Sequence, residues 1–261
     1  MLEGKRILVT GIATDDSLAL SVAARAQHLG ADVIAAVFPR DRDKAEEALR
    51  ALPKPPLDVV SADLTVPEDL DALSAVIAGH WDGLDGALHA VAFAPRTALS
   101  GPFMDAIAGD VELAFRTSTH SYATLARLLA DHAPAWGAAL VGLDFDGSVA
   151  WPVYNWMGVC KSALESANRY LARDLGPSGI RSNLVAAGPI HTRAAGAIPG
   201  FELLLQAWDE QAPLAWSPID TAPVADAVCF LLSDFARAVT GEILHVDGGF
   251  HATATRLPAV P

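Results

Sequence analysis

The chain has 261 residues, of which 52 % are hydrophobic and 19 % charged, and its 18 basic and 31 acidic side chains give a net charge of −13. This composition is typical of a protein with a sizeable buried core and argues against a disordered chain. An acidic protein repels nucleic-acid phosphates and anionic lipid surfaces, so we expect neither as a partner.

Signals for export, membrane insertion and metal binding are absent from the sequence. A strand-like stretch begins at Arg6, which leaves no room for a signal peptide before it. No apolar run reaches the roughly 18 residues that a membrane span needs, so we expect a cytoplasmic protein. Cys160, Cys229 and the eight histidines form no metal-ligand spacing, so no metal is expected and the two thiols should be reduced and buried.

Short apolar segments alternate with longer amphipathic ones along the chain. The segments with strand character are 6–10, 32–37, 57–61, 84–91, 137–142, 180–185 and 242–246. The segments with helical character are 17–29, 41–51, 67–79, 105–132, 154–174 and 221–233. This alternation predicts an α/β fold, with a doubly wound parallel sheet of the Rossmann type and helices on both faces. We expect a single domain over 1–261, with a tail from about Thr253.

The stretch 188–216 follows the sixth expected strand and is interrupted by glycines and prolines, which predicts an irregular connection. Ligands of open α/β sheets bind beyond the carboxyl ends of the strands. Residues from about 190 to 216 are therefore expected to form a substrate-binding lid.

The ends of the first two expected strands bear on cofactor binding. Gly11 ends the first strand, where a glycine lets the backbone approach a pyrophosphate at the start of the next helix. The full GxGxxG pattern is absent, so an ordinary turn glycine remains an equal alternative. The second strand ends at Phe38 without an acidic residue for the adenosine ribose, and Arg40 and Arg42 leave a 2′-phosphate open.

Tyr154 and Lys161 form a candidate catalytic pair on one expected helix. They are seven residues apart, which at about 100° per residue is about 20° short of two turns. Both side chains then project from one face, so the lysine could reach a ribose while the tyrosine faces a reacting carbonyl. The alternative is a capping tyrosine and a surface lysine.

At this point a family resemblance is clear. The segments Tyr154–Met157, Lys161–Ser166 and Arg181–Ile190 resemble the enoyl-acyl-carrier-protein reductases, a divergent branch of the short-chain dehydrogenase/reductase superfamily, and especially their mycobacterial members. The resemblance runs from about Gly4 to His251, nearly the whole chain. The Tyr-x6-Lys element is specific to this branch.

The resemblance implies an NADH site built along the whole chain. The residues that it assigns to the cofactor are Gly11, Ile12, Ser17 and Leu18 at the pyrophosphate, Phe38 at the adenosine ribose, Asp63 and Leu64 at the adenine, Ala92 and Lys161 at the nicotinamide-side ribose, and Ile190 and Thr192 at the nicotinamide and phosphates.

The resemblance also implies the reaction, which is hydride transfer to the β-carbon of a trans-2-enoyl thioester carried on acyl carrier protein. Tyr154 would hydrogen-bond the thioester carbonyl, Phe145 would pack near the nicotinamide and the enoyl chain, and Lys161 would complete the catalytic set. A homotetramer is implied as well.

The acyl pocket is expected to be short. Its expected lining consists of Trp151, Met157, Ile198, Phe201 and Leu204. The lid between Gly200 and Trp208 is shorter than in the long-chain mycobacterial members, and the bulky Trp151 stands where methionine is usual. Both features predict a preference for short or medium acyl chains, and the alternative is that 201–207 is simply a compact helix and Trp151 points elsewhere. Further departures from the family pattern, at Ala90, Arg116, His191 and Arg193, concern substrate identity more than reaction type.

Two other functions remain open. A carbonyl reductase of the same fold would carry a serine about a dozen residues before a Tyr-x3-Lys pair, and here that spacing is missing because Gly158 takes the place of the lysine. A non-catalytic NAD-binding protein would tolerate loss of Tyr154 or Lys161, and both are present.

Overall fold

Seven parallel strands form one sheet in the order β3-β2-β1-β4-β5-β6-β7, in a computed structural model that describes residues 1–254. The strands are β1 (Arg6–Thr10), β2 (Asp32–Val37), β3 (Asp58–Ser61), β4 (Gly86–His89), β5 (Ala139–Asp144), β6 (Arg181–Ala187) and β7 (Ile243–Val246). All seven expected strands are confirmed, two of them with the expected ends and the others with ends shifted by at most two residues. The α/β class and the doubly wound parallel sheet are confirmed with them.

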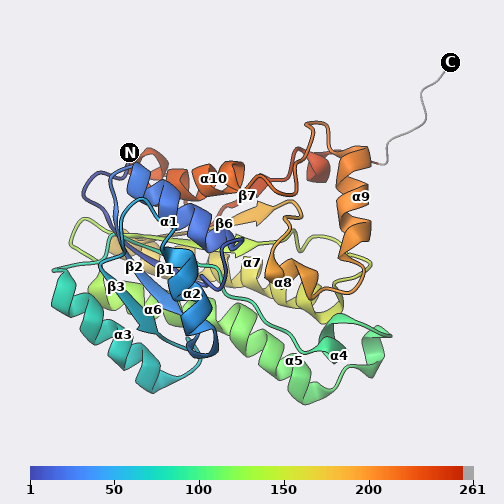
Figure 1. Cartoon of the computed structure of the whole chain (residues 1–261), viewed down its shortest axis with the longest axis horizontal. Coiled ribbons are helices and arrows are strands. Elements are labelled where there is room, and N and C mark those ends of the chain that lie inside the picture. Colours follow the sequence, from blue (N-terminus) through green and yellow to red (C-terminus); the bar gives the residue numbers. More distant parts are fainter. Residues whose placement is uncertain (255–261) are drawn as a thin grey trace.

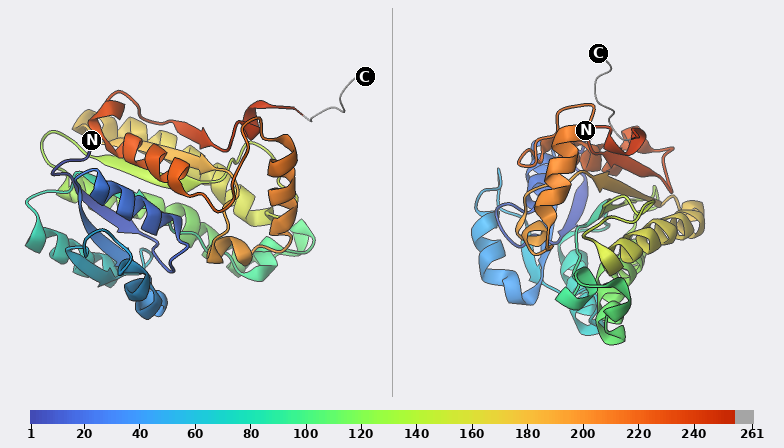
Figure 2. Two further views of the ribbon diagram at one scale, coloured as in Figure 1. Left: turned by 45° about the horizontal axis from the view of Figure 1, so that its top comes forward. Right: turned by 90° about the vertical axis from the view of Figure 1, so that its right-hand side faces the viewer.

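Helices cover both faces of the sheet (Figure 1, Figure 2). The helices that pack on it are α1 (Leu18–His28), α2 (Arg42–Leu49), α3 (Pro67–His80), α6 (Ser121–His132), α7 (Asn155–Leu175) and α10 (Ala222–Leu232). One apolar core joins the sheet to α1, α2 and α10, and a second joins it to α3, α6 and α7.

The two cores explain why the strands are apolar without alternation. In β1, Ile7 and Val9 belong to the core beneath α1 and α10, whereas Leu8 belongs to the opposite core. Successive side chains of a strand point to opposite faces, and here both faces are covered. A continuous apolar run is therefore what this sheet requires.

The expected single helix over 105–132 is wrong in detail. The structure divides it into a short turn Phe103–Asp105, α5 (Ala108–Phe115), a π-helical segment Arg116–His120 and α6. The hydroxyl of Ser118 in the π segment accepts a bond from Phe93 N at 2.9 Å and donates to Phe93 O at 3.0 Å. This pairing joins the π segment to the loop after β4. Hydrophobic periodicity does not predict such a contact between distant residues.

The expected irregular connection after β6 is also only partly correct. It contains α8 (Arg193–Gly196) and the eleven-residue helix α9 (Phe201–Gln211). Gly200 precedes α9 with φ +81°, a conformation that glycine adopts freely. Both helices lie near the short helix α4 (Arg96–Leu99) at one end of the molecule (Figure 1).

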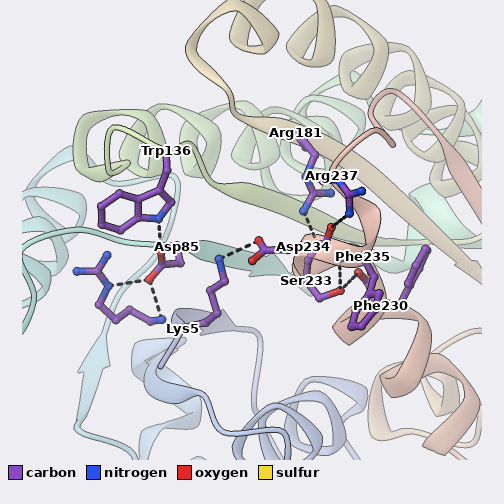
Figure 3. A network of polar contacts seen from close by, with 10 residues as sticks. Lys5, Asp85, Trp136, Arg181, Phe230, Ser233, Asp234, Phe235 and Arg237 are labelled. Carbon is purple, nitrogen blue, oxygen red and sulfur yellow. Dashed lines mark hydrogen bonds and ion pairs between the residues drawn. The ribbon is translucent and has the colours of Figure 1, made fainter. Parts of the chain in front are cut away.

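Polar contacts join the amino ends of several strands to neighbouring segments (Figure 3). Asp85, just before β4, accepts from the Arg6 guanidinium at 2.7 Å and from the Trp136 indole at 3.0 Å. Arg181, which begins β6, donates to Ser233 O at 3.1 Å, and Lys5 donates to Asp234 at 3.0 Å. These contacts at the amino ends of the strands therefore stabilise the fold.

Two further findings concern the described residues alone. Within residues 1–254, no helix is both long and apolar enough to cross a membrane. The expected tail begins at Thr253, and most of it, from Thr255, lies outside the described residues.

Candidate active site

The residues with expected roles gather at the carboxyl edge of the sheet. Gly11, Phe38, Asp63, Ala92, Phe145 and Ile190 each follow a different strand, in the order β1 to β6. The strand order reverses between β1 and β4, which is the switch point where open α/β sheets bind dinucleotides. Ala92 is exposed beside this point, directly after β4.

Gly11 is required by steric packing. Its φ is +87°, and a Cβ on it would lie 2.1 Å from the carbonyl oxygen of Ala90 in the loop after β4. The turn before α1 is held by Ser17, whose hydroxyl accepts from Ala13 N at 3.1 Å and from Thr14 N at 2.9 Å. The loop that would meet a pyrophosphate thus rests directly on the β4 loop.

The end of the cleft where the adenosine is expected has an exposed aromatic ring. Phe38 is 41 % exposed, and the Arg40 guanidinium lies 5.5 Å from its ring centre. Arg42 is already engaged with Glu46 at 2.6 Å and with Ser61 at 3.1 Å. Asp63 Oδ1 accepts from both N and Oγ1 of Thr65 at 2.8 Å, which fixes the turn after β3.

Some of the expected cofactor residues do not reach the cleft surface. Ile12 and Leu64 are 1 % and 4 % exposed and pack in the two apolar cores, so their side chains support the loops instead of lining them. Leu18 begins α1 and also packs against a core.

Tyr154 lies immediately before α7, with its ring 5.1 Å from that of Phe145. Its hydroxyl has no hydrogen-bond partner among residues 1–254, so the donor is free for a substrate. Burial, and then the charge of Asp144, raise the pKa of Tyr154 above 10.0. The phenol therefore stays protonated, and can donate, throughout the physiological pH range.

Lys161 is buried, which contradicts the surface-lysine alternative. It is 6 % exposed, and its Nζ donates to Leu143 O at 2.8 Å. Asp144 Oδ1 lies 3.7 Å from Nζ, an ion-pair contact too long for a hydrogen bond. Burial lowers the pKa of Lys161 and raises the pKa of Asp144 to about 7, and each effect is opposed by the charge of the other residue.

Sequence reasoning gave no role to two residues beside the catalytic pair. Asp144 ends β5, and both of its carboxylate oxygens are buried without a hydrogen-bond partner among residues 1–254. A charged residue inside an apolar run was the available signal. Asn155, the only residue other than glycine with positive φ among those described, has φ +40° and donates to Gly101 O at 3.0 Å. It turns the chain from Tyr154 into α7.

The lid reaches back over the cleft. Thr192 caps α8, because its hydroxyl accepts from Ala195 N at 3.1 Å, and Ile190 is buried at the base of the segment. Arg193 pairs with Asp41 at 3.2 Å, although the two residues follow strands on opposite sides of the switch point. This ion pair joins the lid to the loop after Phe38, across the expected cofactor path.

The five expected substrate-lining residues are brought to the catalytic side chains. Met157 packs in one cluster with Tyr154, and Phe201 and Leu204 form a second cluster with the lid; Phe145, Trp151 and Ile198 contact both. Beside them lies an open groove of about 370 Å³ between α4 and the α8–α9 turn. Its lining residues are Ala94, Arg96, Leu99, Gly196, Ala197 and Pro199.

Comparison with known proteins agrees with this geometry. A family model described as enoyl-(acyl carrier protein) reductase matches residues 11–251. The chain belongs to the enoyl-acyl-carrier-protein reductase family. It is 44 % identical to the NADH-dependent enoyl-acyl-carrier-protein reductase of Mycolicibacterium smegmatis, over 95 % of this chain and 97 % of the relative. It is 43 % identical to that of Mycobacterium avium, with the same coverage, and 37 % to that of Aquifex aeolicus, over 96 % and 93 %.

The buried core of this enoyl reductase also contains an unusual histidine. His89, at the end of β4, is 1 % exposed; its Nε2 lies 2.8 Å from Ser121 Oγ, and its Nδ1 has no partner within the described residues. Burial, and then the charge of Lys161, lower the pKa of His89 from 6.5 to about 3. The folded protein therefore keeps this ring neutral where the unfolded chain would protonate it.

We expect His89 to make the enzyme less stable in acid. Between pH 6.5 and 3 the unfolded chain holds one more proton at this position, so stability is lost as pH falls. The free energy of unfolding of the native protein, relative to that of His89→Gln, should fall by about 1.4 kcal/mol per pH unit in this window. Urea titrations of both proteins at several pH values measure this difference in the free energy of unfolding. The contributions of the other titratable groups are the same in both proteins and cancel. A difference that does not change with pH contradicts the assignment.

Proposed function

We propose that this chain reduces the trans-2 double bond of an enoyl thioester with NADH, in the synthesis of fatty acids or related acyl chains. The observation that carries the proposal is the hydroxyl of the buried Tyr154, which has no partner among residues 1–254 and lies next to Phe145, two helical turns from the buried Lys161. Family membership supports the reaction type, because the relatives are named as NADH-dependent enoyl-acyl-carrier-protein reductases.

The chemistry expected of these residues is stabilisation of a developing negative charge. Bound NADH supplies the hydride that adds to the β-carbon of the substrate. Charge then builds on the thioester oxygen, where a hydrogen bond from Tyr154 is stronger in the transition state than in the ground state. Because the pKa of Tyr154 is raised, the phenol donates this bond without losing its own proton.

The residues at the carboxyl edge fit a dinucleotide. Gly11 and Ala92 flank the switch point, the ring of Phe38 is exposed for the adenosine, and the Lys161 ammonium has donors to spare for a ribose. NADH is favoured over NADPH because Phe38 offers no charge to a 2′-phosphate, Arg42 is already paired, and Arg40 rests on the Phe38 ring.

Lys161→Ala should weaken NADH binding by about 10- to 100-fold, since a charge-assisted hydrogen bond to the ribose is lost. Titration of the protein's tryptophan fluorescence with NADH measures the dissociation constant. Lys54→Ala, which removes a half-exposed lysine paired with Asp32, is the control and should leave the constant unchanged. Unaltered NADH affinity in Lys161→Ala would show that Lys161 does not hold the cofactor.

A panel assay tests the proposed function. Enoyl, ketoacyl and saturated thioesters are supplied on acyl carrier protein and on coenzyme A, with NADH or NADPH, and the loss of reduced-cofactor absorbance is followed. We expect turnover with enoyl thioesters only, and faster with NADH. Preferred turnover of a ketoacyl thioester would make this chain a carbonyl reductase, and binding of NADH without turnover of any substrate would make it a binding protein.

The natural substrate is proposed to be a short or medium acyl chain on acyl carrier protein, which reaches Tyr154 through the groove beside α4. The short lid supports a short or medium acyl chain. Arg96 in the groove supports delivery on acyl carrier protein, because acyl carrier substrates bear a phosphate that an arginine can bind.

A cytoplasmic homotetramer is proposed as well. The supporting observation is a set of exposed apolar side chains before and along α5 and α7, namely Phe103, Met104, Ile107, Phe115 and Val159. Sedimentation at micromolar concentration tests the assembly.

A further inference from the structure

Four aromatic rings lie together, beginning with Phe145 beside Tyr154, and we call Phe145, Trp151, Trp208 and Phe250 the aromatic wall. The Trp151 ring centre is 5.1 Å from that of Phe145, 5.3 Å from that of Trp208 and 5.8 Å from that of Phe250. Trp208 and Phe250 are stacked at 3.8 Å with an angle of 8°. Trp208 belongs to α9 and Phe250 to the turn Phe250–Ala252, which lies beside α9 (Figure 1).

Hydrogen bonds hold the aromatic wall in place. The Trp151 indole donates to Asp146 O at 2.6 Å, and the Trp208 indole donates to Asp247 O at 3.0 Å. The carboxylate of Asp247 accepts from Gly249 N and from His251 N, both at 2.8 Å, which fixes the turn that carries Phe250. Rings that are pinned at their polar edges cannot rotate aside without breaking these bonds.

No space for a hydrocarbon remains behind Phe145. The cavity lined by the wall, His245 and His251 has a volume of about 10 Å³, which is about enough for one water molecule and too small for a hydrocarbon chain. None of the four rings lines the groove of about 370 Å³ beside α4, whose residues Ala94 and Leu99 pack in one cluster with Tyr154. An acyl chain at Tyr154 therefore has packed aromatic rings next to Phe145 and an open groove next to Ala94 and Leu99.

We propose that Trp208 and Phe250, by backing Trp151, are specificity-determining residues that set the longest acyl chain this enzyme accepts. This inference rests on the proposed enoyl-thioester reduction. Trp151 is the ring that meets the acyl terminus, and the Trp208–Phe250 stack prevents it from moving. The C-terminal segment thus takes part in substrate selection without contact with the reacting atoms.

The test is catalytic efficiency across trans-2-enoyl thioesters of increasing length. In the native enzyme each added methylene should raise the efficiency by about fourfold until the wall is reached, and not beyond. Phe250→Ala removes the ring that stacks on Trp208, so the limit should move to chains about two to three methylenes longer. Trp151→Leu should move it in the same direction. Phe235→Ala, at a ring that is 71 % exposed at the other end of the sheet, should not move it.

A binding measurement keeps this test independent of turnover. Saturated acyl thioesters of the same lengths are titrated into the enzyme with NAD⁺ by calorimetry, and the length at which affinity stops rising should shift as the catalytic limit does. Phe250→Leu replaces Phe250→Ala if the latter fails to fold, which NADH titration reveals. Variants that fold and bind NADH but keep the native limit overturn the inference. A native enzyme that reduces no enoyl thioester at all refutes the proposed function instead.

Discussion

Tyr154→Phe is expected to lower the turnover number by about 100- to 1,000-fold and to leave the NADH dissociation constant unchanged. The substitution removes only the hydroxyl, which has no partner among the described residues, so no protein hydrogen bond is lost. A donor aimed at a developing oxyanion contributes about 2.7–4 kcal/mol to the barrier where it is the dominant one. The phenyl ring preserves the packing against Phe145 and Met157.

Stopped-flow and steady-state assays with an enoyl thioester measure this effect, and fluorescence titration measures NADH binding. Tyr170→Phe is the matched control, because Tyr170 lies on the same helix α7 and is 59 % exposed. It should turn over at the native rate. Full turnover in Tyr154→Phe would show that another group stabilises the thioester oxygen.

The sheet was predictable because its signal is local. The central strands are buried on two faces, so a run of apolar residues marks them in the sequence, as in Arg6–Thr10 and Arg181–Ala187. The π segment Arg116–His120 was not predictable, because it depends on bonds from Ser118 to Phe93 and from Thr119 to Cys160 O, 25 and 41 residues away. Helix α9 was expected only as an alternative, a compact helix over 201–207, because the glycines and prolines around it mask its short amphipathic pattern.

Some residues of the candidate site were likewise predictable from the sequence, and others were not. Tyr154 and Lys161 were found because helical spacing relates them, and the family resemblance supplied their roles. The Arg193–Asp41 ion pair and the Trp208–Phe250 stack join residues 152 and 42 positions apart, and only the folded chain brings them together. The lid is therefore tied at α8 to the adenosine side and at α9 to the C-terminal turn. Neither contact follows from composition or periodicity.

Gly11→Ala should be the most damaging small substitution in the cofactor loop. The added Cβ would lie 2.1 Å from Ala90 O and 2.6 Å from Ala90 C, and both are backbone atoms that no side-chain rotation can relieve. The φ of +87° adds about 1–2 kcal/mol of strain for any residue with a Cβ. We expect a loss of about 3 kcal/mol or more in the free energy of unfolding, together with strongly weakened NADH binding.

Urea unfolding and NADH titration of the same samples measure the two effects. Gly109→Ala is the matched control, because Gly109 lies in α5 and a Cβ there would meet no atom within 4 Å. That substitution should be neutral or stabilising by about 0.4–1 kcal/mol, since alanine restricts the unfolded chain more than glycine does. The contrast separates the close approach of the β1 and β4 loops from the general cost of losing a glycine. If Gly11→Ala retains native stability, the two loops can move apart, and the steric requirement at the switch point is wrong.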